Sequence, residues 1–511
     1  MGLPPDEPFS AGALRRNFGY FAVGKIGSGI IGIGVVVLMV RLLSEPDYGS
    51  YVSLVALLEI VLLVSNAGSY PIAQRYFTDA MLDDNRVWLG KLVVRAFALR
   101  AGSLVLVALA LGVASASIAD GLRLPGVAAA LPLYALVIVF EGSARFIDLV
   151  FEGMLEQRRA QVCAIVRSGT RLAILFAMLR LGGDLSLLDA VKVDLAGAAV
   201  GLTVSLAMLR RTVSSISPHR PAPDAADPFS WRRMTGFALP LYLAQIVTQA
   251  YGPDTVKLVI GRMMGAMEVA AFGFAHALSL ILQRYLPAQL LLGLVRPALV
   301  ARQARGAPNE QLARAGNLIL KINHFLLVPV AAFVGVGGTE LVLLVSKGKH
   351  ALAGGILFWL VALLLLQALH VVLSMLATAL EDRRAVLFAT LAATPGVVAG
   401  ILLANVAGIG GMLAGLWASE LLWCATARRM LSARGFQFPI DWRGWCKLLA
   451  AGAIAALGAL PPGWPAGLAG VCLQAGVVGT VFLVACRLLR PFTAEERAQI
   501  NRMLPKPVFV F

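Results

Sequence analysis

Long apolar stretches alternate with short polar segments along almost the whole chain. About fourteen of these stretches contain the roughly 20 mainly apolar residues that a helix needs to cross a bilayer core of about 30 Å. They are rich in Leu, Val, Ala and Gly and lack the two-residue alternation of membrane β-barrel strands. Lipid offers the backbone no hydrogen-bond partners, so the pattern predicts an all-α polytopic membrane protein. The stretches lie near residues 18–42, 48–74, 93–117, 126–150, 161–181, 187–209, 235–260, 267–294, 317–345, 352–379, 385–406, 409–427, 445–461 and 466–488.

The composition agrees with this pattern. The chain has 511 residues, of which 59% are hydrophobic and 14% are charged, and its mean hydropathy is +0.80. Soluble proteins have about 25% charged residues, so much of this surface must face lipid. The first apolar run is too long for the apolar core of a signal peptide, and no cleavable signal is expected. The five cysteines show no CxxC spacing, and neither a disulfide framework nor a metal site is predicted.

The charged loops predict the orientation of the chain. If the N-terminus, with Arg15 and Arg16, is cytoplasmic and the helices alternate, the inner loops contain most of the Lys and Arg residues. Both termini are then cytoplasmic. The net charge of +16 is thus mainly an orientation signal. It predicts contact with anionic membrane lipids and not with nucleic acid.

A polar linker and a short repeat predict the domain organisation. The stretch RLLSEPDYGSY (41–51) is similar to RMMGAMEVAAF (262–272), and both are expected in outer loops. We therefore expect two parallel lobes of about six helices each, as in transporters built from repeats. The predicted parts are an N-terminal lobe (1–209), a cytoplasmic linker (210–234), a C-terminal lobe (235–430), and two accessory helices with a cytoplasmic tail (431–511).

Residues 19–34 contain two near-matches to nucleotide-binding motifs. Gly19 to Lys25 spells GxxxxGK, but Ile26 follows the lysine where a phosphate-binding loop needs Ser or Thr. Gly27 begins a GxGxxG pattern that no strand precedes. Closely spaced glycines in a membrane helix instead predict close packing against another helix.

Ionisable side chains inside the predicted spans are the candidate functional residues. Each costs roughly 2.5–3.5 kcal/mol near the bilayer centre, so such residues usually line cavities or form pairs. Glu141 and Arg145 are four residues apart, which suits a local pair along one helix. Arg167 and Arg171 are two like charges on one helix face, which requires an opposing anion or acid. We expect them to line a cavity, with a structural pair to an acid on a neighbouring helix as the alternative. The candidate cations are Lys25, Arg145, Arg167, Arg171, Lys257 and Arg284, and the candidate acids for ion coupling are Glu59, Glu141 and Asp254.

The stretch RLLSEPDYGSYVSLVALLEIVLLVSNAGSYPIAQRYF resembles the start of the bacterial polysaccharide (Wzx-type) flippases, whose superfamily includes the multidrug and toxin extrusion transporters. The resemblance extends over about residues 15–430. In the second half, Lys257 stands at the family's arginine position, whereas Val256 replaces the expected aspartate and the acid has moved to Asp254. The residues that match the family's first loop are Arg41, Leu42, Leu43, Glu45, Asp47, Tyr48, Gly49 and Tyr51.

The resemblance implies a non-enzymatic transporter of the bacterial inner (cytoplasmic) membrane. Such a protein exports an undecaprenyl-diphosphate-linked saccharide by alternating access, without a bound cofactor but coupled to H⁺ or Na⁺, and works beside the polysaccharide polymerase machinery. A basic interior suits a diphosphate, because arginine binds phosphate through two parallel hydrogen bonds. A cation or multidrug exporter of the same fold is the first alternative and would need an acidic cavity. A membrane glycosyltransferase or polymerase is the second, and the short predicted outer loops argue against it.

Overall fold

The computed structural model describes residues 11–80, 88–124, 126–154, 156–216, 229–249, 252–284, 308–380, 382–460, 463–503 and 509–511. These residues form α-helices, and the described part contains one isolated β-bridge, between Leu43 and Leu185, and no named strand. The chain divides into two compact units, residues 1–270 and 271–511. This division follows packing within the chain. The lobe boundaries predicted from the linker remain a prediction, and the middle of that linker (217–228) lies outside the described residues.

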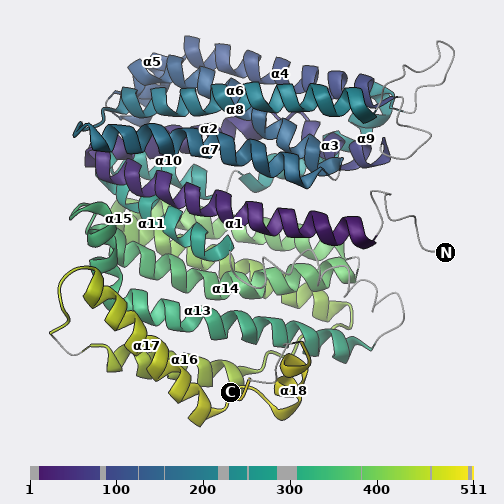
Figure 1. Ribbon diagram of the computed structural model, residues 1–511. Coiled ribbons are helices and arrows are strands. Elements are labelled where there is room, and N and C mark those ends of the chain that lie inside the picture. Colours follow the sequence, from purple (N-terminus) through teal and green to yellow (C-terminus); the bar gives the residue numbers. More distant parts are fainter. Residues whose placement is uncertain are drawn as a thin grey trace. The chain divides into compact units, whose positions relative to one another are not determined.

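The helices are labelled in Figure 1. Those that begin in the first unit are α1 (Ala11–Leu42), α2 (Glu45–Val64), α3 (Ser69–Asp79), α4 (Leu89–Val113), α5 (Ser115–Leu122), α6 (Val127–Gly153), α7 (Gln157–Arg180), α8 (Leu187–Ile216), α9 (Trp231–Gln249), α10 (Pro253–Met263) and α11 (Ala266–Arg284). Those of the second unit are α13 (Asn309–Ser346), α14 (Leu352–Ala379), α15 (Arg383–Ala433), α16 (Trp442–Gly458), α17 (Leu468–Leu489) and α18 (Ala494–Met503).

The prediction of an all-α polytopic membrane protein is confirmed. Within the described residues, ten helices are long and apolar enough to cross a membrane: α2, α4, α6, α7, α8, α11, α13, α14, α15 and α17. The predicted total of about fourteen spans is not confirmed, since some predicted spans do not map onto one continuous helix.

Several boundaries differ from the predicted spans. The span predicted over 48–74 is broken between α2 and α3, and the span over 235–260 is broken between α9 and α10. The spans predicted at 385–406 and 409–427 both lie within α15, where Gly408 departs from helical geometry (φ 55°, ψ −138°). A Cβ on Gly400 would lie 2.8 Å from Cα of Gly415, so the two halves of α15 pack closely together. Apolar periodicity finds these segments but does not find the breaks inside them.

The predicted close packing of the glycines near the N-terminus holds for Gly24 and Gly34 but not for Gly27 and Gly32, which have open space around them. Helix α1 is continuous through residues 19–34, which excludes a phosphate-binding loop there. It packs against α7. A Cβ on Gly34 would lie 2.9 Å from a methyl carbon of Leu172, and a Cβ on Gly24 would lie 2.5 Å from Cβ of Gln161. The close neighbours are thus side chains of α7.

Helix α2 begins and ends at defined polar positions. The Ser44 hydroxyl accepts a hydrogen bond from the backbone N–H of Asp47 at 3.2 Å, which caps the first turn. The chain leaves the helix at residues 65–68, where Ala67 and Gly68 have positive φ angles of 46° and 82°. The Asn66 side chain then accepts the backbone N–H of Tyr70 at 2.8 Å and caps α3. The break therefore lies inside an apolar segment but keeps its polar groups bonded, as lipid requires.

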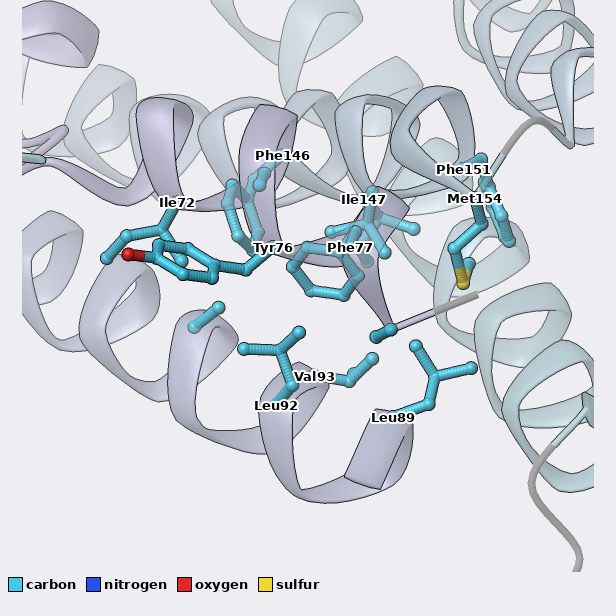
Figure 2. Packing of buried hydrophobic residues seen from close by; sticks show 14 of the residues in the cluster. Ile72, Tyr76, Phe77, Leu89, Leu92, Val93, Phe146, Ile147, Phe151 and Met154 are labelled. Atoms are coloured by element: carbon cyan, nitrogen blue, oxygen red, sulfur yellow. The ribbon is translucent and has the colours of Figure 1, made fainter. Parts of the chain in front are cut away.

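The first unit has apolar cores between its helices. Figure 2 shows one of them, in which rings and branched side chains from α3, α4 and α6 interleave. Phe77, Phe146 and Leu89 are fully buried there. Burying a side chain of this size contributes about 1.5–3 kcal/mol, which fixes the relative positions of these helices. The second unit has a comparable core on α13, α14 and α15, which includes Leu373 and Leu376.

Candidate functional site

Four helices of the first unit bring ionisable side chains into one network, which we call the charged network. Helix α6 packs against α2, α7 and α8, and α7 packs against α8. Because α6 contributes acids and a base at spacings of three and four residues, these side chains lie along one face. The members are Glu59 on α2; Glu141, Arg145 and Asp148 on α6; Arg167 and Arg171 on α7; and Asp194 on α8.

Glu141 is the centre of the charged network. Its Oε1 accepts a hydrogen bond from Arg145 Nε at 2.7 Å and lies 3.3 Å from Arg167 Nε. Its Oε2 accepts a hydrogen bond from Arg171 Nη2 at 2.7 Å. The side chain is only 3% exposed, so these contacts operate in a medium that screens charge weakly. One carboxylate thus organises all three arginines.

The outer carboxylates each engage one arginine. Glu59 Oε1 is 2.8 Å from Arg145 Nη1. Asp148 Oδ2 accepts a hydrogen bond from Arg167 Nη2 at 2.8 Å. Asp194 Oδ1 is 3.1 Å from Nε of Arg171, and its Oδ2 accepts a hydrogen bond from the hydroxyl of Tyr51 at 3.0 Å. All the acids therefore have specific partners.

Two glycines of α8 make room for the arginines of α7. A Cβ on Gly201 would lie 2.9 Å from Cβ of Arg167, and a Cβ on Gly197 would lie 2.5 Å from Cγ of Arg171. The glycines are four residues apart, which is the small-xxx-small pattern of close membrane helix pairs. This spacing was available in the sequence and would have predicted that α8 packs closely against another helix.

One edge of the charged network is accessible. The side chains of Arg145 and Glu59 are 34% and 35% exposed, whereas that of Glu141 is almost completely buried. A ligand that approaches the charged network can therefore reach the Glu59–Arg145 pair before it reaches the central carboxylate.

The expectation of a predominantly basic interior is wrong for this part of the chain. Three guanidinium groups face four carboxylates, which leaves one formal negative charge in excess. The sequence showed the like-charged arginines but not which acids lie opposite them. For Arg167 and Arg171 the structure agrees with the alternative expectation, because both pair with acids on neighbouring helices. The local pair of Glu141 and Arg145 is confirmed, while Asp148 pairs with α7.

The other predicted site residues lie apart from these contacts. Lys257 of α10 pairs with Asp254 one turn away, at 2.8 Å, and both belong to the first unit. Lys25 is on α1, but its side chain lies outside what the structure describes. Arg284 is exposed at the end of α11, in the second unit. A substrate-binding role for any of the six cations remains a prediction.

Sequence reasoning missed Arg100, which lies on α4 and is 0% exposed. Its Nη1 donates to the carbonyl of Leu62 at 3.0 Å and to Oγ of Ser65 at 3.1 Å, at the carboxyl end of α2. Its guanidinium also lies 5.5 Å from the centre of the Tyr70 ring. A cation at the carboxyl end of a helix is attracted by the unpaired carbonyls and by the negative end of the helix dipole. Within the described residues no carboxylate pairs with Arg100, and its Nε and Nη2 have no hydrogen-bond partner.

Comparison with known proteins identifies the family. Residues 14–290 match the family described as polysaccharide biosynthesis protein. The chain belongs to this family. Membership confirms the resemblance inferred from the first loop, and it agrees with the multi-pass membrane architecture. No curated protein matches the sequence of this family member significantly.

Two solved structures share the fold of this polysaccharide biosynthesis protein. The lipid II flippase MurJ in an inward closed conformation has a TM-score of 0.68 and 12% sequence identity, over 92% of this chain and 98% of MurJ. An inward-facing multidrug resistance transporter of the MATE family, in the MOP superfamily, has a TM-score of 0.63 and 16% identity, over 80% of this chain and 95% of that transporter. At such identities the likeness shows a common fold.

Proposed function

We propose that the protein is a flippase that moves an undecaprenyl-diphosphate-linked oligosaccharide from the cytoplasmic to the periplasmic leaflet of the bacterial inner membrane. Membership of the polysaccharide biosynthesis family carries this proposal. The fold shared with a lipid II flippase supports it, because that protein is named for a lipid-linked substrate. Transport proceeds by alternating access, both termini are cytoplasmic, and no covalent bond of the substrate is made or broken.

The electrical work favours export of this substrate. A diphosphate linkage carries about two negative charges, and the membrane potential is negative inside. Outward movement of two charges is downhill by about 4.6 kcal/mol per 100 mV. The protein must still provide groups that replace the water around the phosphates.

The accessible edge of the charged network suggests how these groups become available. Arg145 is occupied by Glu59 and Glu141, so a diphosphate must displace one carboxylate. Glu59 is the more exposed of the two. When H⁺ or Na⁺ neutralises Glu59, the adjacent Nη1 of Arg145 loses its ionic partner and can donate to a phosphate oxygen. Neutralisation also removes the excess negative charge that would repel the substrate.

A strain that lacks this gene tests the function. We expect the lipid-linked oligosaccharide to accumulate in the inner leaflet, where it stays inaccessible to a periplasmic glycosidase. The wild-type gene should restore access, Arg145→Ala should not, and Arg145→Lys should restore it in part because it keeps a positive charge. Normal periplasmic access in the deletion strain would refute the proposal. Lys192→Ala, which removes an exposed lysine that pairs with Asp189, is the control for removing a cation.

The acidic excess of the charged network favours a second candidate, export of cationic drugs. A carboxylate-rich site attracts cations, and a multidrug transporter shares the fold. Sensitivity of the deletion strain to cationic dyes, without a change in surface polysaccharide, would support this candidate. A defect in polysaccharide without dye sensitivity would support the flippase, which we then expect to work beside the polymerase machinery.

A further inference from the structure

A histidine and a glutamate meet between two apolar helices of the second unit. Helix α14 has no Asp, Glu, Lys or Arg in its 28 residues, and its one histidine is His370. Helix α15 has a single acid, Glu420, in its 51 residues. His370 Nδ1 lies 2.6 Å from Oε1 of Glu420. Each group alone would be costly in lipid, so their pairing is a specific arrangement.

The imidazole ring is fixed by an aromatic stack. The ring of Trp423 lies parallel to that of His370, with centroids 3.4 Å apart and an interplanar angle of 9°. The indole itself is 4% exposed, and its Nε1 donates to Oγ1 of Thr390 at 3.3 Å. A protonated imidazole gains from the face of an indole through a cation–π interaction. The stack therefore holds the ring beside Glu420.

The geometry leaves one ring nitrogen available. Because Nδ1 faces the carboxylate of Glu420, the neutral ring carries its proton there and has a lone pair on Nε2. Nε2 makes no hydrogen bond within the described residues. The His370 side chain is 34% exposed and that of Glu420 is 15% exposed, so the pair can exchange protons from the Nε2 edge.

Proton uptake changes the net charge of the pair. The neutral imidazole with an ionised carboxylate has a net charge of −1. A proton from water that binds the lone pair of Nε2 gives imidazolium and carboxylate, with a net charge of zero. Histidine is the side chain whose unperturbed charge change falls in the physiological pH range. The pair can thus take up and release one proton.

Other titratable groups at this level have different partners. Helix α14 packs against α13 and α15. It also contacts α11, where Gln283 donates to Oε1 of Gln367 at 3.2 Å and the neighbouring Arg284 is exposed. Lys321 of α13 binds Asp441 and Glu496, and Nδ1 of His324 faces the carbonyl of Leu320 in its own helix. Cys424 of α15 donates to the carbonyl of Leu366 at 3.9 Å. Between Arg384 and Glu420, α15 contains no acidic and no basic residue.

We propose that His370 and Glu420 form a proton-binding site that couples transport to a proton gradient, an inference that rests on the proposed transport function. The site is separate from the charged network and lies in the other unit. The coupling ion at this site is the proton. The fluorescence of the stacked Trp423 ring reports its binding.

Proton binding is tested first, on the full chain in lipid nanodiscs. Imidazolium quenches a stacked indole, so we expect tryptophan fluorescence to fall reversibly with pH between about 8 and 5. Trp423→Phe and His370→Gln should each abolish this component. His324→Gln should leave it intact, although His324 lies 5.2 Å from the ring of Trp445. A pH response that is unchanged in His370→Gln, or absent from the wild type, would overturn the proton site.

Coupling is tested in liposomes that contain lipid-diphosphate-linked oligosaccharide, with and without a pH gradient. We expect the gradient to accelerate transport several-fold in the wild type. His370→Gln can still donate to Glu420 but cannot carry the proton, so gradient-free exchange should persist while the acceleration is lost. Full acceleration in this variant would overturn the coupling role. Absence of any transport by the wild type would instead refute the proposed function, and the fluorescence titration would still decide the proton site.

Discussion

Replacing Glu141 by Gln tests whether one buried carboxylate organises the charged network. The substitution keeps the volume of the side chain but removes the charge that contacts three guanidinium groups within 3.3 Å. Removing one partner from a buried ion pair costs about 3–5 kcal/mol, because the remaining charge stays buried. The excess negative charge also disappears, which offsets part of this loss. We therefore expect a decrease of about 3 kcal/mol in the free energy of unfolding.

Glu59 provides the matched control within the same network. Its side chain is 35% exposed and contacts one arginine, so Glu59→Gln should cost at most about 1 kcal/mol, as for exposed pairs. Both variants are compared with the wild type by denaturant titration in mixed micelles. The decisive quantity is the difference between the two free energies of unfolding. An equal loss in both variants, or a larger loss for Glu59→Gln, would show that burial of Glu141 does not set the strength of these contacts.

Three further predictions concern other parts of the chain. Gly201→Ala should lower the free energy of unfolding by about 1–3 kcal/mol through the clash with α7, whereas Gly27→Ala, which has open space around it, should be nearly neutral in the same titration. Arg100→Ala should lower it by several kcal/mol, and Arg100→Lys by less because a cation still faces the carboxyl end of α2; equal losses would contradict this reason. Burial alone would raise the pKa of Asp441, but the hydrogen bond from Lys321 and a backbone N–H of α16 hold this pKa below its usual range. The resulting stability is present above the unfolded value of about 3.9 and is lost as the pH falls through the lower folded value. Asp441→Asn should remove this part of the acid dependence, which a thermal melt at each pH measures.

The breaks and contacts show where sequence reasoning reaches its limit. The apolar run that contains α2 identified a membrane segment correctly, but the predicted span was extended through the polar residues Ser65 to Gly68, where the helix breaks. At this end of α2, Arg100 donates hydrogen bonds to the carbonyl of Leu62 and to Oγ of Ser65, and its position in the sequence gives no sign of these partners. Similarly, the sequence placed Arg167 and Arg171 on one face of a helix. It did not show that Glu141 lies opposite them.

The sequence by itself determined the all-helical membrane architecture, the family and most of the individual spans. These properties depend on local hydropathy and on ordered motifs, which a linear pattern records directly. Only the tertiary structure decided the charge balance of the charged network and the meeting of His370 with Glu420. Both depend on the rotation of packed helices about their axes, and residues 50 positions apart come into contact only after that packing is complete.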